Sequence, residues 1–310
     1  MTETIELIAF PGAPNLPIFT AIENGYFAAG DVEVNLTTTP SSVYQIENLA
    51  SGKFQIAATA VDNVVAYQEG QGAVALQGEP DLFAFMGATQ IELSFVVAPE
   101  IKTFADLKGK TLALDALATG FAFVLYQMLE NAGLSLSDVT MEPVGATPDR
   151  WQSVKDGTHA GTLTIEPFTS MARAEGYHVL ESSLDTLDHY QGGVFAARHT
   201  WADAHNHALK GFISGYLQGL AQVLDPKNRI EAADTLLRNM PAINPGAVDK
   251  VLDKVLSPKS GLTPDAAINM DGMQSVLSLR SRYGATGNIL DAPARYLDLS
   301  YLQDVQSGRQ

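Results

Sequence analysis

The beginning of the chain contains a strand, a tight turn and a helix in immediate succession. Residues 5–10 form an apolar run of the length of a buried strand, and residues 11–15, PGAPN, form a turn. Apolar side chains from Leu16 to Ile22 then recur at helical spacing. In α/β folds, ligands bind where a strand ends and the N–H groups of the next helix face outward. Asn15 can both donate and accept a hydrogen bond, so we expect it to contact a ligand there.

Strand and helix patterns alternate along most of the 310 residues. Short apolar runs at residues 32–36 and 56–59 predict strands, and each is followed by a loop and a helical pattern. From His199 onward the spacing is helical, and one helix is expected at residues 263–282, with Pro264 in its first turn. Such alternation predicts parallel sheets with helices on both faces, in one large domain or two of ordinary size.

Motifs spread over the chain resemble those of a known family. Residues 21–27 read AIENGYF, residues 31–34 read DVEV, residues 101–111 read IKTFADLKGKT and residues 164–168 read TIEPF. This series resembles type II substrate-binding proteins of ABC importers. It is most similar to the NMT1/THI5-like and SsuA-like branch, which contains binders of alkanesulfonates, thiamin-precursor pyrimidines and aromatic acids.

The resemblance, together with the alternating pattern, implies a two-lobed type II periplasmic-binding-protein fold of the α/β class with a central ligand cleft. We assign residues 1–97 and 193–310 to lobe one and residues 98–192 to lobe two. The chain then crosses between the lobes near Val97 and Gly193. Loops at the strand ends of both lobes are expected to grip the ligand, and lobe closure is expected to shield it from water.

The loops after the strands contain the residues that we expect to bind the ligand. These candidates are Asn15, Ser41, Ser42, Asp62, Thr119, Gly120, Phe121, Arg150 and Glu166. Each has a simpler structural role as its alternative. Asn15 can instead shape its turn, and the two serines and Asp62 can cap helices. Thr119 and Gly120 can form a cap and a turn, and Phe121 can belong to the core. The arginine can be solvated at a helix end, and the glutamate can be a charge at the rim.

The composition argues against several classes of function. The formal net charge is −16, from 19 basic and 35 acidic residues, whereas nucleic acids and anionic membranes attract clustered Lys and Arg. The chain has no cysteine, which excludes disulfides, Cys-based metal sites and thiol nucleophiles. Its six histidines form no HExxH pair, so we expect neither a metal site nor a cofactor.

The resemblance also implies a partner and a cellular location. A binding protein of this kind presents a small-molecule ligand to an ABC permease, and we expect it to be a monomer. No window reaches the roughly 18 apolar residues of a membrane span, so no stable membrane insertion is expected. Residues 1–4 lack the basic and apolar regions of a signal peptide. The protein is therefore expected to be periplasmic or extracytoplasmic if a signal peptide was removed, and otherwise cytoplasmic.

The charges expected in the cleft bear on the ligand class. Arg150 could hold an anion, but the carboxylates of Asp62 and Glu166 would disfavour a strongly anionic ligand unless both point away. The first candidate ligand is therefore a neutral or weakly basic heteroaromatic compound, such as a thiamin-precursor pyrimidine. The second candidate ligand is an aromatic carboxylate held by Arg150 and backbone N–H groups.

Two other functions stay open from the sequence. One is a cofactor-free enzyme on the same fold, a lyase or a thiamin-pyrimidine-related enzyme, acting on a small aromatic substrate. Relatives of this kind use cysteines that this chain lacks, but Asp62 or Glu166 could act as a general base. The other is a cytoplasmic ligand sensor with a protein partner. The binding protein remains the leading interpretation because its motifs run along the whole chain.

Overall fold

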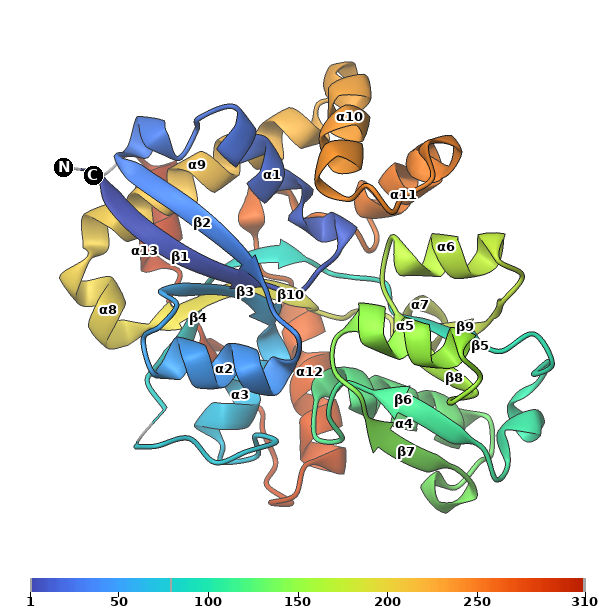
Figure 1. The fold of residues 1–310 in the computed structure, drawn as a ribbon. Helices are drawn as coiled ribbons and strands as arrows, with labels where there is room; N and C mark the ends of the chain where they lie inside the picture. The colour runs from blue at the N-terminus through green and yellow to red at the C-terminus, as the bar shows by residue number, and fades with distance from the viewer. Residues whose placement is uncertain (1, 79, 309–310) are drawn as a thin grey trace.

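The structure is a computed structural model, and it describes residues 2–78 and 80–308. Met1, Glu79 and the last two residues, which the sequence assigns to lobe one, lie outside the described residues. Figure 1 shows two α/β halves side by side, with both chain termini at the outer end of one half. The predicted two-lobed α/β fold is confirmed.

Each lobe is built on one sheet of five strands within the described residues. The first sheet has the order β2-β1-β3-β10-β4, with β1 Glu3–Ala9, β2 Val32–Thr38, β3 Ile56–Ala60, β4 Leu82–Thr89 and β10 Gly193–Arg198. The second has the order β7-β6-β8-β5-β9, with β5 Ser94–Val97, β6 Thr111–Leu114, β7 Thr140–Pro143, β8 Gly161–Thr164 and β9 His178–Ser182. Strands that are distant in sequence are thus neighbours in both sheets.

The sheets are mixed, which corrects the expectation of parallel sheets. In the first sheet β1 pairs parallel with β2 and β3, whereas β10 pairs antiparallel with β3 and β4. In the second sheet β5 pairs antiparallel with β8 and β9. Each reversed strand brings the chain in from the other lobe. It therefore starts at the sheet edge where its neighbours end, and that edge faces the other lobe.

The first crossing between the lobes lies earlier than the sequence predicts. Strand β5 is hydrogen-bonded into the second sheet, so the chain has crossed before Ser94 rather than at residue 97. An apolar strand pattern shows that a strand forms, but it does not show which sheet the strand joins. Gly193 begins β10 in the first sheet, so the chain has returned to the first lobe by that residue.

Helices cover both faces of the first sheet because the side chains of its strands alternate. Ile5 and Leu7 of β1 pack in one core cluster with α1 (Leu16–Glu23) and α9 (Asn206–Leu224), whereas Ile8 packs in another with α2 (Ser42–Ala50) and α3 (Val61–Gln68). The helices of the first lobe before the crossing are α1 Leu16–Glu23, α2 Ser42–Ala50 and α3 Val61–Gln68. Those of the second lobe are α4 Gly120–Asn131, α5 Thr147–Lys155, α6 Phe168–Ala174 and α7 Ser183–Thr186. After β10 come α8 His199–Ala204, α9 Asn206–Leu224, α10 Arg229–Asn239, α11 Val248–Val255, α12 Met270–Tyr283 and α13 Ser300–Gln306.

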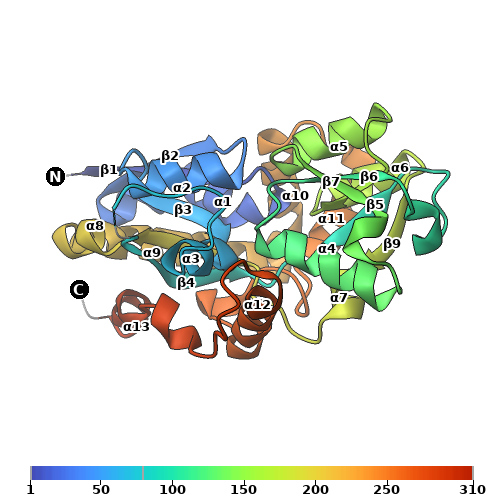
Figure 2. The same cartoon turned by 90° about the horizontal axis from the view of Figure 1, so that it is seen from below.

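Helix α12 joins the two lobes. Figure 2 shows it between α3 of the first lobe and α4 of the second, and one core cluster includes Val65 of α3, Phe123 of α4 and Leu277 of α12. The helix begins at Met270 rather than near Pro264, so the predicted helix at 263–282 is too long at its N-terminal end. Asp265 adopts a left-handed conformation with φ of 56°, which interrupts the helical pattern there.

Candidate functional site

A cleft lies between the lobes, at the edge where strands of both sheets end. It encloses about 870 Å³ of empty space, counting the part that is open to solvent. Much of the wall is apolar and includes Phe10, Ile18, Ile91, Phe121, Ile165 and Phe195. Polar residues enter at the beginnings of α2, α4 and α5, where helix N–H groups are available. An apolar cleft with a few polar groups is the usual form of a small-molecule site.

Arg150 is a buried cation in the wall of the cleft. It lies in α5, and 3% of its surface is exposed. Its Nη2 donates to Oγ1 of Thr147 at 2.8 Å, but the buried Nε and Nη1 have no hydrogen-bond partner among the described residues. Burial lowers the pKa of the guanidinium to about 10, against the attraction of Asp115 and Asp149. Arg150 thus remains charged at neutral pH, and its buried Nε and Nη1 donate to no described residue.

The two serines at the start of α2 have different positions. Ser42 lines the cleft, but its N–H already donates to both carboxylate oxygens of Asp115, at 3.2 and 3.1 Å. Ser41 caps the helix, since its Oγ accepts the N–H of Tyr44 at 3.1 Å, and it is not part of the lining. Asp115 is not among the residues that the sequence analysis predicts to bind a ligand. It is the first residue after β6, so the rule that strand ends face the cleft could have found it.

Four other predicted residues also line the cleft: Asn15, Thr119, Gly120 and Phe121. Asn15 has the turn-shaping role as well, because its Nδ2 donates to the carbonyl of Phe10 at 2.8 Å. Thr119 caps α4 through its hydroxyl, which accepts an N–H of the first turn. A structural role and a place in the cleft lining therefore coincide at Asn15 and Thr119, where helices begin.

Asp62 does not line the cleft. It is 1% exposed, and its Oδ1 accepts Nε of Arg280 at 2.6 Å. Its Oδ2 accepts Nη2 of Arg280 and the N–H of Gly120, each at 2.5 Å. Arg280 also donates to the carbonyl of Ala118 at 2.8 Å. The carboxylate is therefore occupied by groups from α12 and α4, and the expectation that it contacts the ligand is corrected.

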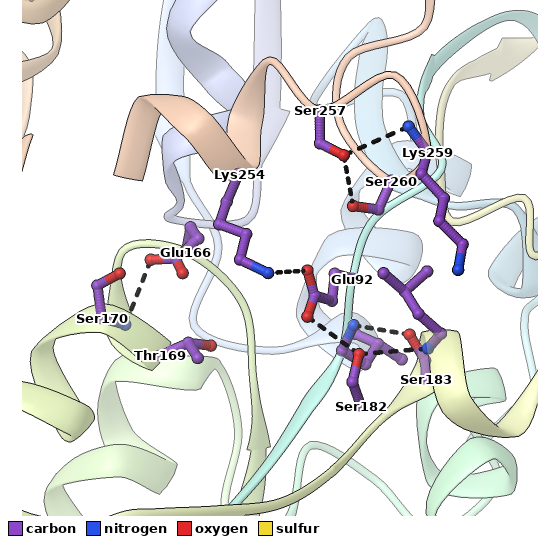
Figure 3. A network of polar contacts seen from close by, with 12 residues as sticks. Glu92, Glu166, Thr169, Ser170, Ser182, Ser183, Lys254, Ser257, Lys259 and Ser260 are labelled. Carbon is purple, nitrogen blue, oxygen red and sulfur yellow. Dashed lines mark hydrogen bonds and ion pairs between the residues drawn. The ribbon is translucent and has the colours of Figure 1, made fainter. Parts of the chain in front are cut away.

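Glu166 borders a small side cavity next to the cleft. Figure 3 shows it opposite Lys254 and Glu92, which line the same cavity and are joined at 2.9 Å. Oε2 of Glu166 accepts the N–H of Ser170 at 3.3 Å. Burial raises the pKa of Glu166, and the hydrogen bond from Ser170 opposes the increase. With Asp62 also outside the lining, the two carboxylates do not form an acid/base pair across the main cleft.

Backbone hydrogen bonds join the two rims of the cleft. The N–H of Ala13 donates to the carbonyl of Glu166 at 3.0 Å, and the N–H of Ala146 donates to that of Pro40 at 2.8 Å. Gly145, with φ of 113°, allows the second contact, since a Cβ there would lie 2.8 Å from the carbonyl oxygen of Pro40. The backbones of the two lobes are therefore in direct contact at two places.

Within residues 2–78 and 80–308, no cluster of three or more His, Cys, Asp or Glu side chains could hold a metal ion. No helix in those residues has the length and apolar character needed to cross a membrane.

Comparisons with known proteins agree with this architecture. The sequence model of the family described as NMT1/THI5 like matches residues 14–229. A formylaminopyrimidine-binding protein from Halalkalibacterium halodurans is 24% identical over 269 residues, which are 82% of this chain and 76% of that protein. The ligand-binding component of an ABC-type import system from Staphylococcus aureus superposes with a TM-score of 0.80 at 11% identity, covering 99% and 100% of the two chains. The alkanesulfonate-binding protein SsuA from Xanthomonas axonopodis pv. citri, bound to MOPS, has a TM-score of 0.73 at 16% identity and coverage of 95% and 98%.

Proposed function

The chain belongs to the NMT1/THI5-like family, and on that premise we propose that it is a solute-binding protein that presents a small organic ligand to an ABC importer. The observation that carries this proposal is Arg150, a buried cation in an apolar cleft with two unused donors. Leaving such donors unpaired is unfavourable, so a ligand that accepts from them gains affinity. One relative of this chain is a formylaminopyrimidine-binding protein, and one structural neighbour is the ligand-binding component of an ABC-type import system.

The geometry changes the order of the ligand classes. The preference for a neutral or weakly basic heteroaromatic compound depended on Asp62 and Glu166 facing the cleft, and neither lines it. The ligand that we propose is therefore a small aromatic or otherwise apolar compound with one acidic group, a carboxylate or a sulfonate, held by Arg150. The apolar walls of the cleft would contact the apolar part of this ligand.

Asp115 supports a second candidate. It is the one carboxylate among the described residues that line the cleft, and it could accept a hydrogen bond from an amino group. A neutral aminopyrimidine would use it in this way, and one relative is a formylaminopyrimidine-binding protein. This candidate leaves the two free donors of Arg150 to a neutral acceptor, so we place it second.

The remaining proposals concern the assembly. We propose that residues up to the crossing before Ser94, together with residues 193–310, form lobe one. We also propose that the protein acts as a monomer outside the cytoplasm and docks on an ABC permease. Binding without chemical change is favoured over an enzyme, because the two carboxylates considered as bases lie outside the main cleft.

A ligand screen with two variants tests this function. The purified protein is heated with aromatic carboxylates, alkanesulfonates, pyrimidines and thiamin precursors, and each stabilising compound is recovered for mass spectrometry. A ligand at about 100 times its Kd adds about 2.7 kcal/mol, which raises the Tm by several degrees. We expect an acidic compound to raise the Tm of the wild type and of Arg229→Met, but not that of Arg150→Met. The control residue Arg229 is a surface cation paired with Asp253 at 2.8 Å.

Other outcomes of the screen would contradict specific parts of the proposal. A compound recovered in altered form would indicate an enzyme. Stabilisation by pyrimidines alone, retained in Arg150→Met, would contradict the acidic ligand and support the second candidate.

A further inference from the structure

The cleft has two places that attract an anion, and the protein itself occupies one of them. One place is Arg150, with its unpartnered Nε and Nη1. The other is the beginning of α2, a helix of nine residues whose first N–H groups carry the positive end of the helix dipole. At α2, the N–H of Ser42 donates to both oxygens of Asp115, at 3.2 and 3.1 Å. Asp115 belongs to the loop after β6, in the other lobe.

Both partners of this contact face the ligand space. Ser42 and Asp115 line the cleft, and Asp115 and Arg150 are its two charged lining residues within the described part of the chain. Their formal charges cancel. A second oxyanion of a ligand placed at α2 would compete with Asp115 for the same N–H, and it would lie next to a carboxylate of like charge.

We propose that Asp115 is a specificity-determining residue, an internal anion that occupies the beginning of α2 and restricts the cleft to ligands with a single acidic group. The inference rests on the proposed binding function and adds a rule for selection. The acidic group of the ligand is left to Arg150, while compounds with two acidic groups are rejected. Selection of this kind acts through an unfavourable element against the wrong ligand.

The contact has a second consequence that the test must separate from selection. Because Asp115 joins one lobe to the other, its removal also weakens closure and lowers the affinity for every ligand that needs the closed cleft. Loss of affinity alone therefore does not distinguish selection from closure. The informative quantities are the binding of a free anion and the ratio of affinities for two ligands that differ by one acidic group.

Inorganic sulfate is the first probe, because it needs no knowledge of the natural ligand. We expect Asp115→Ala to bind one more sulfate than the wild type by isothermal titration calorimetry. In crystals soaked with selenate, an anomalous peak is expected beside the N–H of Ser42. The matched control is Asp149→Ala, since Asp149 is an exposed carboxylate that also acts on the charge of Arg150, while no hydrogen bond joins its side chain to α2 among the described residues. The control should bind sulfate as the wild type does.

A pair of aromatic acids is the second probe. Benzoate and terephthalate share a ring and differ in one carboxylate. We expect the wild type and Asp149→Ala to bind benzoate at least about tenfold more tightly than terephthalate, as like-charge rejection predicts. Asp115→Ala should lower that ratio to about threefold or less, even if both affinities fall. Asp115→Asn keeps an acceptor for Ser42 but loses the charge, so it should also lower the ratio of affinities. This variant replaces Asp115→Ala in the test if the alanine variant does not fold.

The outcomes separate this inference from the proposed function. If acids from the screen bind the wild type but Asp115→Ala gains no sulfate site and keeps the benzoate preference, the assignment of Asp115 is wrong and the binding function stands. If no compound of the screen binds while Asp115→Ala gains the sulfate site, the internal anion stands and the proposed function and its selection rule are wrong. If neither occurs, both are contradicted.

Discussion

Arg150 is a buried residue whose proposed role in binding comes at the expense of stability. A buried guanidinium loses hydration, and here one of its nitrogens finds a protein acceptor, Oγ1 of Thr147. The lowered pKa of about 10 reflects that loss. A ligand acid would supply the missing acceptors, so the free protein carries an unfavourable charge that binding relieves.

The first prediction follows from the unfavourable free energy of burying the charge of Arg150. Replacing Arg150 by Met should increase the free energy of unfolding of the ligand-free protein by about 1 kcal/mol, because the buried charge is removed and the volume is largely kept. Urea denaturation at neutral pH measures the change as a higher midpoint with the same m-value. A variant less stable than the wild type would show that Arg150 mainly supports the fold.

A second prediction concerns Glu166 and pH. Burial raises the pKa of this carboxyl in the folded protein above its ordinary value of 4.5. The folded state then holds the proton more strongly than the unfolded state, so stability falls as the pH rises from the ordinary pKa through the raised one. Glu166→Gln should therefore raise the Tm at pH 7 and leave it nearly unchanged at pH 4. Equal Tm differences at both pH values would contradict this account.

At the scale of elements, α12 holds the beginnings of α3 and α4 together. Arg280 of α12 pairs with Asp62 of α3, and Asp62 accepts the N–H of Gly120, the first residue of α4. A Cβ at Gly120 would lie 2.6 Å from Cβ and Cγ of Asp62, so this close contact depends on glycine. Asp62 and Arg280 thus hold the start of α4 in position, although they do not line the cleft themselves. The part of the wall formed by Thr119, Gly120 and Phe121 depends on them.

A third prediction tests this junction by removing its charges singly and together. Asp62→Ala should lower the free energy of unfolding by about 3–5 kcal/mol, because it leaves the buried Arg280 unpaired. The double variant Asp62→Ala/Arg280→Met should lose less than the single one, as thermal or urea unfolding would show. Asp253→Ala, which breaks an exposed pair with Arg229, is the control and should cost less than about 1 kcal/mol. Equal losses in the single and double variants would argue against a coupled pair.

At the scale of the whole molecule, the two lobes meet around the cleft through backbone groups and through Asp115. The bonds from Ala13 to Glu166 and from Ala146 to Pro40 lie on its rims. They involve main-chain atoms, so they form whenever the lobes approach, whatever the ligand. Their formation therefore reports closure directly.

A fourth prediction uses these amides as reporters. A saturating acidic ligand should slow hydrogen exchange at the N–H groups of Ala13 and Ala146 by about tenfold or more, because it shifts the population toward the closed form. The N–H of Thr39, which bonds to Ala9 within lobe one at 2.9 Å, should be unaffected. Unchanged exchange at both rims on ligand binding would contradict closure by this route.

Much of the cleft could be located from the sequence because strand ends are local features. A strand, a turn and a helix beginning are specified by neighbouring residues, and parallel strands bring such loops to one edge. Asn15, Ser42, Thr119, Gly120, Phe121 and Arg150 were found in this way and do line the cleft. The sheet joined by β5 was not predictable, because its apolar residues suit a central strand in either lobe.

The sequence by itself determined the alternation of strands and helices, most of the loops that meet at the cleft, the excess of acidic residues and the absence of cysteine. Tertiary structure alone decided which charges are free to act. Asp62 meets Arg280, 218 residues away, while Asp115 meets the beginning of α2 and Arg150 keeps two donors unpaired. The physical reason is that a charge belongs to one residue, whereas its hydration and its partners depend on groups that only folding brings together.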